Sequence, residues 1–172
     1  MAKQRTSSRK RSRRRTTTQT SVPGRGERPQ TTAGSSRKPC VIAVLNSNQD
    51  VLRVIREALE DEGYLVATKH IVDFKEGLAN LGQFLNEHQP SAMIYDLAPP
   101  YQENWNFLQL VQQIPDVAAI PTVLTTVNKA ALDHTVGRTE AFEILGTRDN
   151  LAPMIERVNQ VVRHTRLRRR RW

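Results

Sequence analysis

The chain of 172 residues has room for one domain of ordinary size with a substantial hydrophobic core. Its formal net charge of +9 is unevenly distributed: residues 1–39 contain 12 Lys or Arg and one acid, residues 40–162 contain eight Lys or Arg and 16 acids, and residues 163–172 contain six Arg and no acid. The single cysteine, Cys40, excludes an internal disulfide, and no apolar run approaches the roughly 18 residues that a membrane span requires.

Residues 1–39 contain too few apolar side chains to offset the entropy of ordering them. We expect them to form a disordered basic tail, rich in Arg, Ser and Thr. The tail lacks the apolar stretch of a secretory signal and the amphipathic stripe of an organellar transit peptide. We therefore predict a cytoplasmic protein.

From residue 40 onward, short apolar runs alternate with segments whose apolar residues recur at helical spacing. The runs predict strands at 41–45, 64–68, 91–97, 120–126 and 141–145. The segments between and after them predict helices at 51–59, 74–85, 105–114, 129–135 and 151–162. Asp50 is the predicted N-cap of the first helix. The second helix is predicted from Phe74, Leu78, Leu81, Phe84 and Leu85.

Strands that alternate with helices indicate right-handed crossovers and a parallel sheet covered on both faces. Five such units predict an α/β domain at 40–164, with the flavodoxin-like, doubly wound arrangement and strand order 2-1-3-4-5. Residues 165–172 form a second predicted basic tail, rich in Arg. In this order the side of the sheet to which successive strands are added changes between the first and third strands. The site is therefore expected in the loops that follow these two strands. Asp96 ends the third strand.

These loops lack the motifs of a nucleotide site or a hydrolase. The one G-x-G, Gly24-Arg25-Gly26, lies in the N-terminal tail and has no third glycine. The four histidines, His70 among them, have no metal-ligand spacing with one another or with Cys40, and we predict surface or edge positions for them. We therefore expect neither enzymatic activity nor a bound cofactor.

The strand ends carry a resemblance to a known family. Segments 44–52, 95–108, 120–126 and 143–149 resemble those of the receiver domain of bacterial response regulators. Receivers place an acidic pair after the first strand, a phospho-accepting Asp after the third, a Ser or Thr after the fourth, and a Lys-Pro after the fifth. The corresponding residues here are, in that order, Asn46 and Ser47, Asp96, Thr125 and Thr126, and Thr147 and Arg148.

This chain departs from the family at the charged positions. Asn46 and Ser47 lack the carboxylates that Mg²⁺ prefers, so Asp96 alone is a weak Mg²⁺ candidate. Thr147 lacks the charge of the family's lysine, for which Arg148 is a candidate replacement. Phosphoryl transfer depends on positioning and charge neutralisation. Two modes stay open in a two-component phosphorelay: phosphorylation of Asp96, and a degenerate receiver acting by protein–protein contact. The departures favour the second.

The resemblance also implies partners. Receivers commonly bind other proteins through the face formed by the fourth helix, fifth strand and fifth helix, which corresponds here to residues 129–162. A histidine kinase or a downstream signalling protein is therefore the expected partner.

The two basic tails suggest a second class of function. Clustered Lys and Arg bind phosphates by releasing counterions, and such binding to nucleic acid does not depend on base sequence. The terminal Trp172 could stack on a base. A solubilising role, a contact with the acidic body, and an anionic membrane surface stay open as alternatives. The candidate nucleic-acid contacts are Arg13, Arg14, Arg15, Arg168, Arg169, Arg170 and Arg171.

Overall fold

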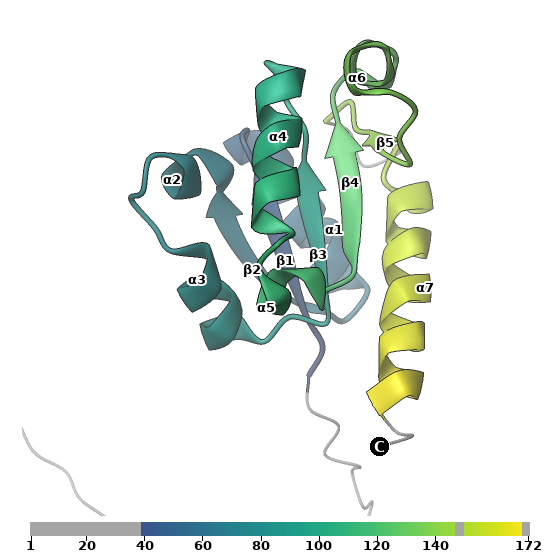
Figure 1. Cartoon of the computed structure of the whole chain (residues 1–172). Coiled ribbons are helices and arrows are strands. Elements are labelled where there is room, and N and C mark those ends of the chain that lie inside the picture. The colour runs from purple at the N-terminus through teal and green to yellow at the C-terminus, as the bar shows by residue number, and fades with distance from the viewer. Residues whose placement is uncertain (1–38, 147–149, 170–172) are drawn as a thin grey trace, which may run out of the picture. The chain divides into compact units, whose positions relative to one another are not determined.

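Five parallel strands form one sheet in the order β2-β1-β3-β4-β5, which confirms the predicted fold class and strand order. The computed structural model describes residues 39–146 and 150–169. Figure 1 shows the strands with their carboxyl ends at one edge of the sheet, the upper edge in that view. The strands are β1 (Val41–Asn46), β2 (Leu65–His70), β3 (Ala92–Asp96), β4 (Thr122–Thr126) and β5 (Phe142–Glu143).

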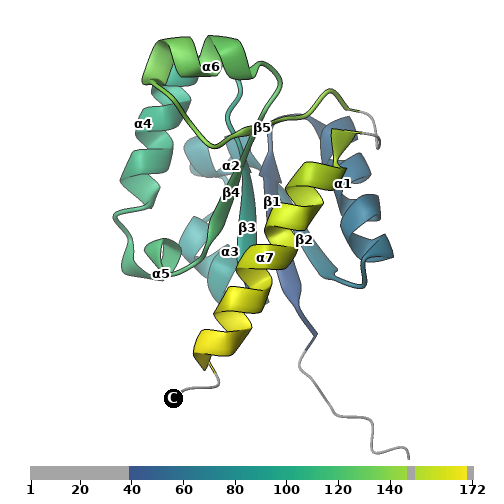
Figure 2. The ribbon, with the colours of Figure 1, turned by 90° about the vertical axis from the view of Figure 1, so that its right-hand side faces the viewer.

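Both faces of the sheet are covered by helices, so the core has two layers. In β1, Ile42 and Val44 belong to one buried cluster while Ala43 and Leu45 belong to the other, as the alternation of strand side chains requires. Figures 1 and 2 show α1 and α7 on the opposite side of the sheet from the remaining helices. The helices are α1 (Gln49–Asp61), α2 (Ile71–Lys75), α3 (Leu81–His88), α4 (Tyr101–Val111), α5 (Pro115–Ala118), α6 (Lys129–Val136) and α7 (Ala152–Arg169).

The predicted helix at 74–85 is wrong, because this segment contains two short helices, α2 and α3, joined by a turn. Gly77 has φ +71°, a left-handed conformation that ends a helix. Leu78 is consequently 73 % exposed, although its spacing in the sequence suggested a buried position. The Asn80 side chain then accepts a hydrogen bond from the Gln83 amide and starts α3.

The N-cap of α1 is Asn48, and the prediction of Asp50 is wrong. Asn48 Oδ1 accepts hydrogen bonds from the amides of Asp50 and Val51, at 2.8 and 3.2 Å. Asp50 lies in the first turn, where its charge is favourable next to the helix N-terminus. Ser47 therefore directly precedes the N-cap residue of α1, which begins at Gln49.

The predicted strand at 141–145 is shorter in the structure, where β5 contains only Phe142–Glu143. It pairs with β4 at two positions, Thr125↔Phe142 and Thr126↔Glu143. Beyond them Leu145 is 62 % exposed and Gly146 has φ +77°, so the chain turns away from the sheet. Because β5 is the edge strand of the sheet, it forms strand hydrogen bonds on one side only.

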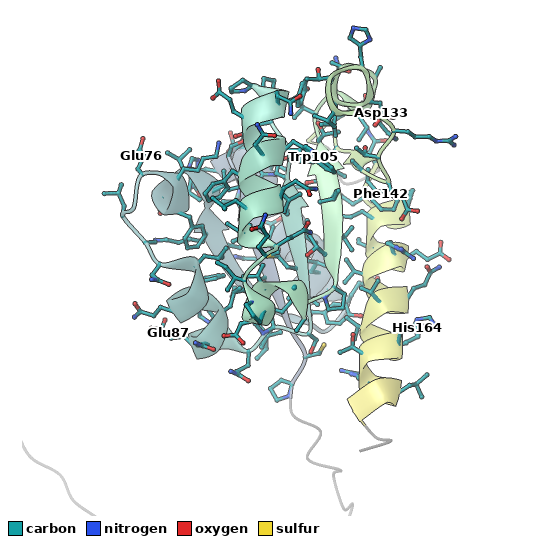
Figure 3. All side chains as sticks on the ribbon, viewed as in Figure 1. Glu76, Glu87, Trp105, Asp133, Phe142 and His164 are labelled. Atoms are coloured by element: carbon teal, nitrogen blue, oxygen red, sulfur yellow. The ribbon has the colours of Figure 1, made fainter. Side chains whose placement is uncertain are left out.

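A polar network fixes the loop between α6 and β5. Lys129 Nζ donates to Asp133 Oδ2 at 2.6 Å and to the Thr139 carbonyl at 2.8 Å. The Thr139 hydroxyl and amide both donate to Asp133 Oδ1. These hydrogen bonds, that of Lys129 first, lower the pKa of Asp133 to about 2. Figure 3 shows Asp133 beside this loop, above Phe142 of β5. The network therefore fixes α6 to the loop that leads into β5.

The helix α7 continues through Arg169, past the expected domain boundary at residue 164. Leu151, Met154, Val158 and Val162 form its buried stripe. The last turns carry charged residues, Arg163 and Arg166 among them. Within the described ranges, none of the helices combines the length and the apolar character needed to cross a membrane.

Candidate functional site

The carboxyl ends of β1, β3 and β4 bring the predicted site residues together at the upper edge of the sheet. Asp96 ends β3 and is paired in register with Thr125 of β4. Asn46 ends β1, on the other side of β3, and Ser47 follows it. Parallel strands place all these residues at one edge because their carboxyl ends coincide. The structure therefore brings Asp96, Ser47 and Thr125, which the sequence analysis placed at strand ends, into direct contact.

Both carboxylate oxygens of Asp96 accept hydrogen bonds from hydroxyl groups. Ser47 Oγ donates to Asp96 Oδ2 at 3.1 Å, and Thr125 Oγ1 donates to Asp96 Oδ1 at 3.3 Å. Asp96 is only 4 % exposed, and Thr125 is fully buried. The carboxyl group is thus held between two uncharged donors from the neighbouring strands.

Burial is the largest effect on Asp96, and it raises the pKa of this carboxyl above its usual value of 3.8. The hydrogen bonds from Ser47 and Thr125 act in the opposite direction but do not outweigh burial. The folded protein therefore binds the Asp96 proton more tightly than the unfolded chain does. Consequently, ionised Asp96 costs stability at neutral pH, and this cost disappears as the pH falls below the unfolded value.

Two of the other four residues predicted for the pocket, Asn46 and Thr126, use their polar groups elsewhere. Asn46 is buried, and its Oδ1 accepts the Asn48 amide at 2.7 Å, which shapes the turn before α1. The Thr126 hydroxyl donates to the Leu97 carbonyl at 2.7 Å. Both side chains support the loops around Asp96 without a hydrogen bond to its carboxyl. Thr147 and Arg148 lie outside the described residues.

His70 contributes to this edge in a way that its predicted edge position did not suggest. It ends β2, in register with Asn46, and its Nε2 lies 2.6 Å from the Ser47 carbonyl. The contact steadies the backbone of the residue whose hydroxyl holds Asp96. The strand was predicted to end at residue 68, so the sequence did not place His70 at the rim.

Asn104 is the second residue that the sequence analysis missed. It is buried on α4, donates to the Ala98 carbonyl, and accepts a hydrogen bond from Lys75 of α2. Lys75 Nζ also lies 5.8 Å from the centre of the Phe107 ring. These contacts fix the loop after Asp96 to the helices beside it. The signal was present, because Asn104 shares a helical face with Leu108 and Val111.

The neighbouring Tyr95 points into the opposite core layer from Ile94. Its hydroxyl is buried and is the only buried side-chain N or O among the described residues that has no hydrogen-bond partner. Burial, and then the charge of Asp96, raise the pKa of Tyr95 well above its usual value. An unpaired buried hydroxyl costs about 1–3 kcal/mol.

The donor set around Asp96 does not fit Mg²⁺. No group of three or more His, Cys, Asp or Glu side chains comes together within 39–146 and 150–169 in a way that could hold a metal ion. Asp96 supplies one carboxylate, and the neighbouring Ser47 and Thr125 are uncharged hydroxyl groups that donate to it. Magnesium requires near-octahedral oxygen coordination, normally with carboxylate charge. The described residues at this edge therefore form a hydrogen-bonded cluster around a single carboxyl group, which does not match the ligand set of Mg²⁺.

The fold is that of response regulator receiver domains. A putative response regulator from Chloroflexus aurantiacus aligns with a TM-score of 0.52 and 19% identity, over 73% of this chain and 98% of that chain. A chemotaxis response regulator of Vibrio cholerae gives 0.51 and 18%, over 70% and 98%. A sensor protein from Polaromonas gives 0.55 and 15%, over 75% and 99%. At these identities the likeness establishes the fold.

The sequence itself gives no comparable match. No protein-family model matches it, and no curated protein matches it. Arg13, Arg14, Arg15, Arg170 and Arg171, predicted to contact nucleic acid, lie outside the described residues. Arg168 and Arg169 belong to the last turn of α7.

Proposed function

We propose that this chain is a receiver-like signalling module of a two-component phosphorelay, and that it acts by protein–protein contact without phosphorylation of Asp96. The observation that carries the proposal is that Asp96 is buried against the uncharged side chains of Ser47 and Thr125, with Asn46 and Ser47 in place of the family's acidic pair. In a receiver that accepts a phosphoryl group, one carboxylate oxygen must be available as nucleophile while nearby cations neutralise the transferred charge.

Three features of the site support the absence of phosphoryl transfer. The carboxyl is almost completely buried, so a phosphodonor has little access to it. Its raised pKa disfavours the ionised, nucleophilic form. Asn46 and Ser47 bring no charge with which to hold a divalent cation, and Asn46 uses its side-chain oxygen to bind Asn48.

The partner surface that we propose is the face formed by α6, β5 and α7, residues 129–162. Two large apolar side chains are exposed at its upper rim: Val127 is 45 % exposed and Leu145 is 62 % exposed. Val127 follows Thr126, and Leu145 follows Ile144. The two exposed residues are near each other because the Ile144 amide donates a hydrogen bond to the Thr126 carbonyl. Exposed apolar groups on a firmly held surface favour a protein partner, which we propose to be a histidine kinase or a downstream signalling protein.

Incubation with acetyl phosphate and Mg²⁺, followed by intact-protein mass spectrometry, tests the mode of action. We expect no phosphoryl adduct on the wild-type protein, because Asp96 is buried and Asn46 and Ser47 supply no carboxylate to hold Mg²⁺. A receiver domain with a complete acidic pair, treated in the same way, controls for the donor. An adduct that forms on the wild type and is absent from Asp96→Asn would show a working phosphoacceptor and refute the proposal.

A further inference from the structure

The outer edge of β2 is open in the part of the chain that the structure describes. β2 pairs only with β1, and Figure 1 shows it at the edge of the sheet opposite β4 and β5. The Leu65 amide donates to the Cys40 carbonyl at 3.0 Å, so the backbone groups of Leu65 face β1. Along a parallel strand these groups alternate in direction, and those of Val66 and Thr68 therefore point away from the sheet. Each of these two residues offers one donor and one acceptor to a further strand.

Two surface hollows flank β2, one on each face of the sheet, and Thr68 lines both. On the α1 side, Arg53 and Arg56 line a hollow of about 330 Å³. On the α3 side, Ala79 and Phe84 line a hollow of about 350 Å³. The side chains of a strand alternate between the two faces of a sheet. A strand added outside β2 would therefore direct its side chains alternately into the two hollows.

The hollow on the α1 side is positively charged. Arg56 Nη2 donates to the Thr68 hydroxyl, which holds this guanidinium at the open edge. Arg53 pairs with Asp50 at 3.2 Å, but the two side chains are 68 % and 86 % exposed, so this pair is weak. Two cations and one carboxylate thus line the hollow. Because a guanidinium binds a carboxylate through two parallel hydrogen bonds, an acidic side chain fits here.

The hollow on the α3 side favours an apolar side chain. One wall is aromatic, since the Phe84 ring packs edge-on against His88 with ring centres 4.7 Å apart. The charged groups of this hollow already have partners. Lys69 pairs with Asp73 at 3.0 Å, and Glu87 accepts a hydrogen bond from its own helix at 2.8 Å. The aromatic wall is therefore the surface that remains for a bound side chain to cover.

We infer that β2 is the docking site for an extended segment of a partner protein, which adds a strand to the sheet and in which acidic residues alternate with apolar ones. Hydrogen bonds to the backbone of Val66 and Thr68 supply affinity, and the two hollows select the side chains. The acidic side chains lie beside Arg53 and Arg56, and the apolar ones lie beside Phe84. β2 and β5 are at opposite edges of the sheet, so the inference does not rest on the proposed partner surface of α6, β5 and α7.

A second copy of this chain fits the edge less well than an acidic segment does. A twofold axis would pair β2 antiparallel with itself. β2 contains no acidic residue, and such pairing would bring Arg56 and Lys69 of both copies to one interface. Like charges that face each other destabilise paired strands. An acidic segment would instead neutralise these cations.

NMR of the full-length protein with the synthetic, end-capped peptide Glu-Val-Glu-Val-Glu-Val tests the inference. We expect the amide signals of Val66 and Thr68 to shift and their hydrogen exchange to slow, because these amides gain hydrogen-bond partners. The amides of Leu65 and Ala67, which face β1, should change little. Binding should weaken as salt is added, since salt screens exposed charges.

Two N-methylated forms of the peptide separate strand addition from attraction between charges alone. One form is methylated at the Glu amides and the other at the Val amides, which removes alternate backbone donors and leaves the charge unchanged. Only alternate amides of an added strand face its neighbour. We therefore expect one form to lose affinity by at least about tenfold while the other still binds. Equal affinity of both forms and the unmodified peptide would overturn the inference.

Charge reversal on α1 tests which face receives the acidic side chains. Arg53→Glu with Arg56→Glu should weaken binding of the Glu-Val peptide by about tenfold and favour a Lys-Val peptide of the same length. Arg138→Glu with Arg157→Glu makes the same change of net charge at exposed positions elsewhere, and should leave both affinities within about twofold. Circular dichroism verifies that each variant is folded.

Three further results would overturn the inference. The first is that the amides of Val66 and Thr68 do not respond to a large excess of the peptide. The second is equal weakening by the two charge-reversed variants, which would show attraction to net charge alone. The third is a dimer of the wild type in sedimentation velocity that protects these amides, which would assign the edge to a second copy. None of these results depends on Asp96 or on the face formed by α6, β5 and α7, so they leave the proposed function unaffected.

Discussion

Replacing Ile94 by alanine is expected to lower the free energy of unfolding by about 2–5 kcal/mol. Ile94 lies in the middle of β3, two residues before Asp96, and is fully buried in the cluster that joins the sheet to α1 and α7. The loss is large because the cavity lies in a strand covered on both faces, where the surroundings cannot collapse freely. Urea unfolding at neutral pH, monitored by circular dichroism, measures it.

Leu110→Ala is the matched control, because it removes the same number of carbon atoms from a side chain that is 60 % exposed on α4. It should change the free energy of unfolding by no more than about 0.5 kcal/mol. Equal losses for Ile94→Ala and Leu110→Ala would contradict the two-layer core around β3.

The double substitution Asn46→Asp with Ser47→Asp is expected to create a Mg²⁺ site beside Asp96. It restores three carboxylates at one edge, which is the ligand chemistry that Mg²⁺ prefers. Without metal, the like charges should destabilise the fold and raise the pKa of Asp96 further. With free Mg²⁺ at 100 times the dissociation constant, binding should stabilise the variant by about 2.7 kcal/mol.

Thermal unfolding with Mg²⁺, and with NaCl at matched ionic strength, measures this effect. The wild type and the uncharged variant Asn46→Ala with Ser47→Ala should show no difference between the two salts. A wild type that Mg²⁺ stabilises as strongly as the double variant would show that Asp96 already has a metal site.

The sheet was predictable because each strand is a short apolar run bounded by polar or turn residues, and the alternation with helices determines the topology. The residues of β3 around Ile94 are buried on both faces of the sheet, so their sequence shows no helical pattern that competes with the strand prediction. The segment from Phe74 to Leu85 failed for the opposite reason. Its apolar residues recur at helical spacing, but the chain turns at Gly77, and this turn depends on backbone conformation, which the spacing of apolar residues does not report.

The components of the site were predictable, but their interactions were not. The position of Asp96 at a strand end follows from the sequence, and so does the loss of charge at Asn46 and Ser47. The direction of each hydroxyl and amide depends on a few ångströms of loop geometry. Sequence alone therefore did not reveal that Ser47 donates to Asp96 while Asn46 binds its own turn.

These interactions suggest how a receiver fold can function without chemistry at its pocket. The hydroxyl of Ser47 occupies an Asp96 oxygen, and His70 contacts the carbonyl of the same serine. The cluster thereby ties β1, β2, β3 and β4 together at the edge next to the proposed partner surface.

The most direct test of the account is the titration of Asp96 in the wild-type protein, followed by NMR of its side-chain carboxyl carbon with and without Mg²⁺. Burial between two uncharged donors predicts a midpoint above the usual 3.8, and the lack of carboxylates at Asn46 and Ser47 predicts that Mg²⁺ does not move it. A midpoint at or below 3.8, or one that Mg²⁺ lowers, would contradict the closed, metal-free cluster.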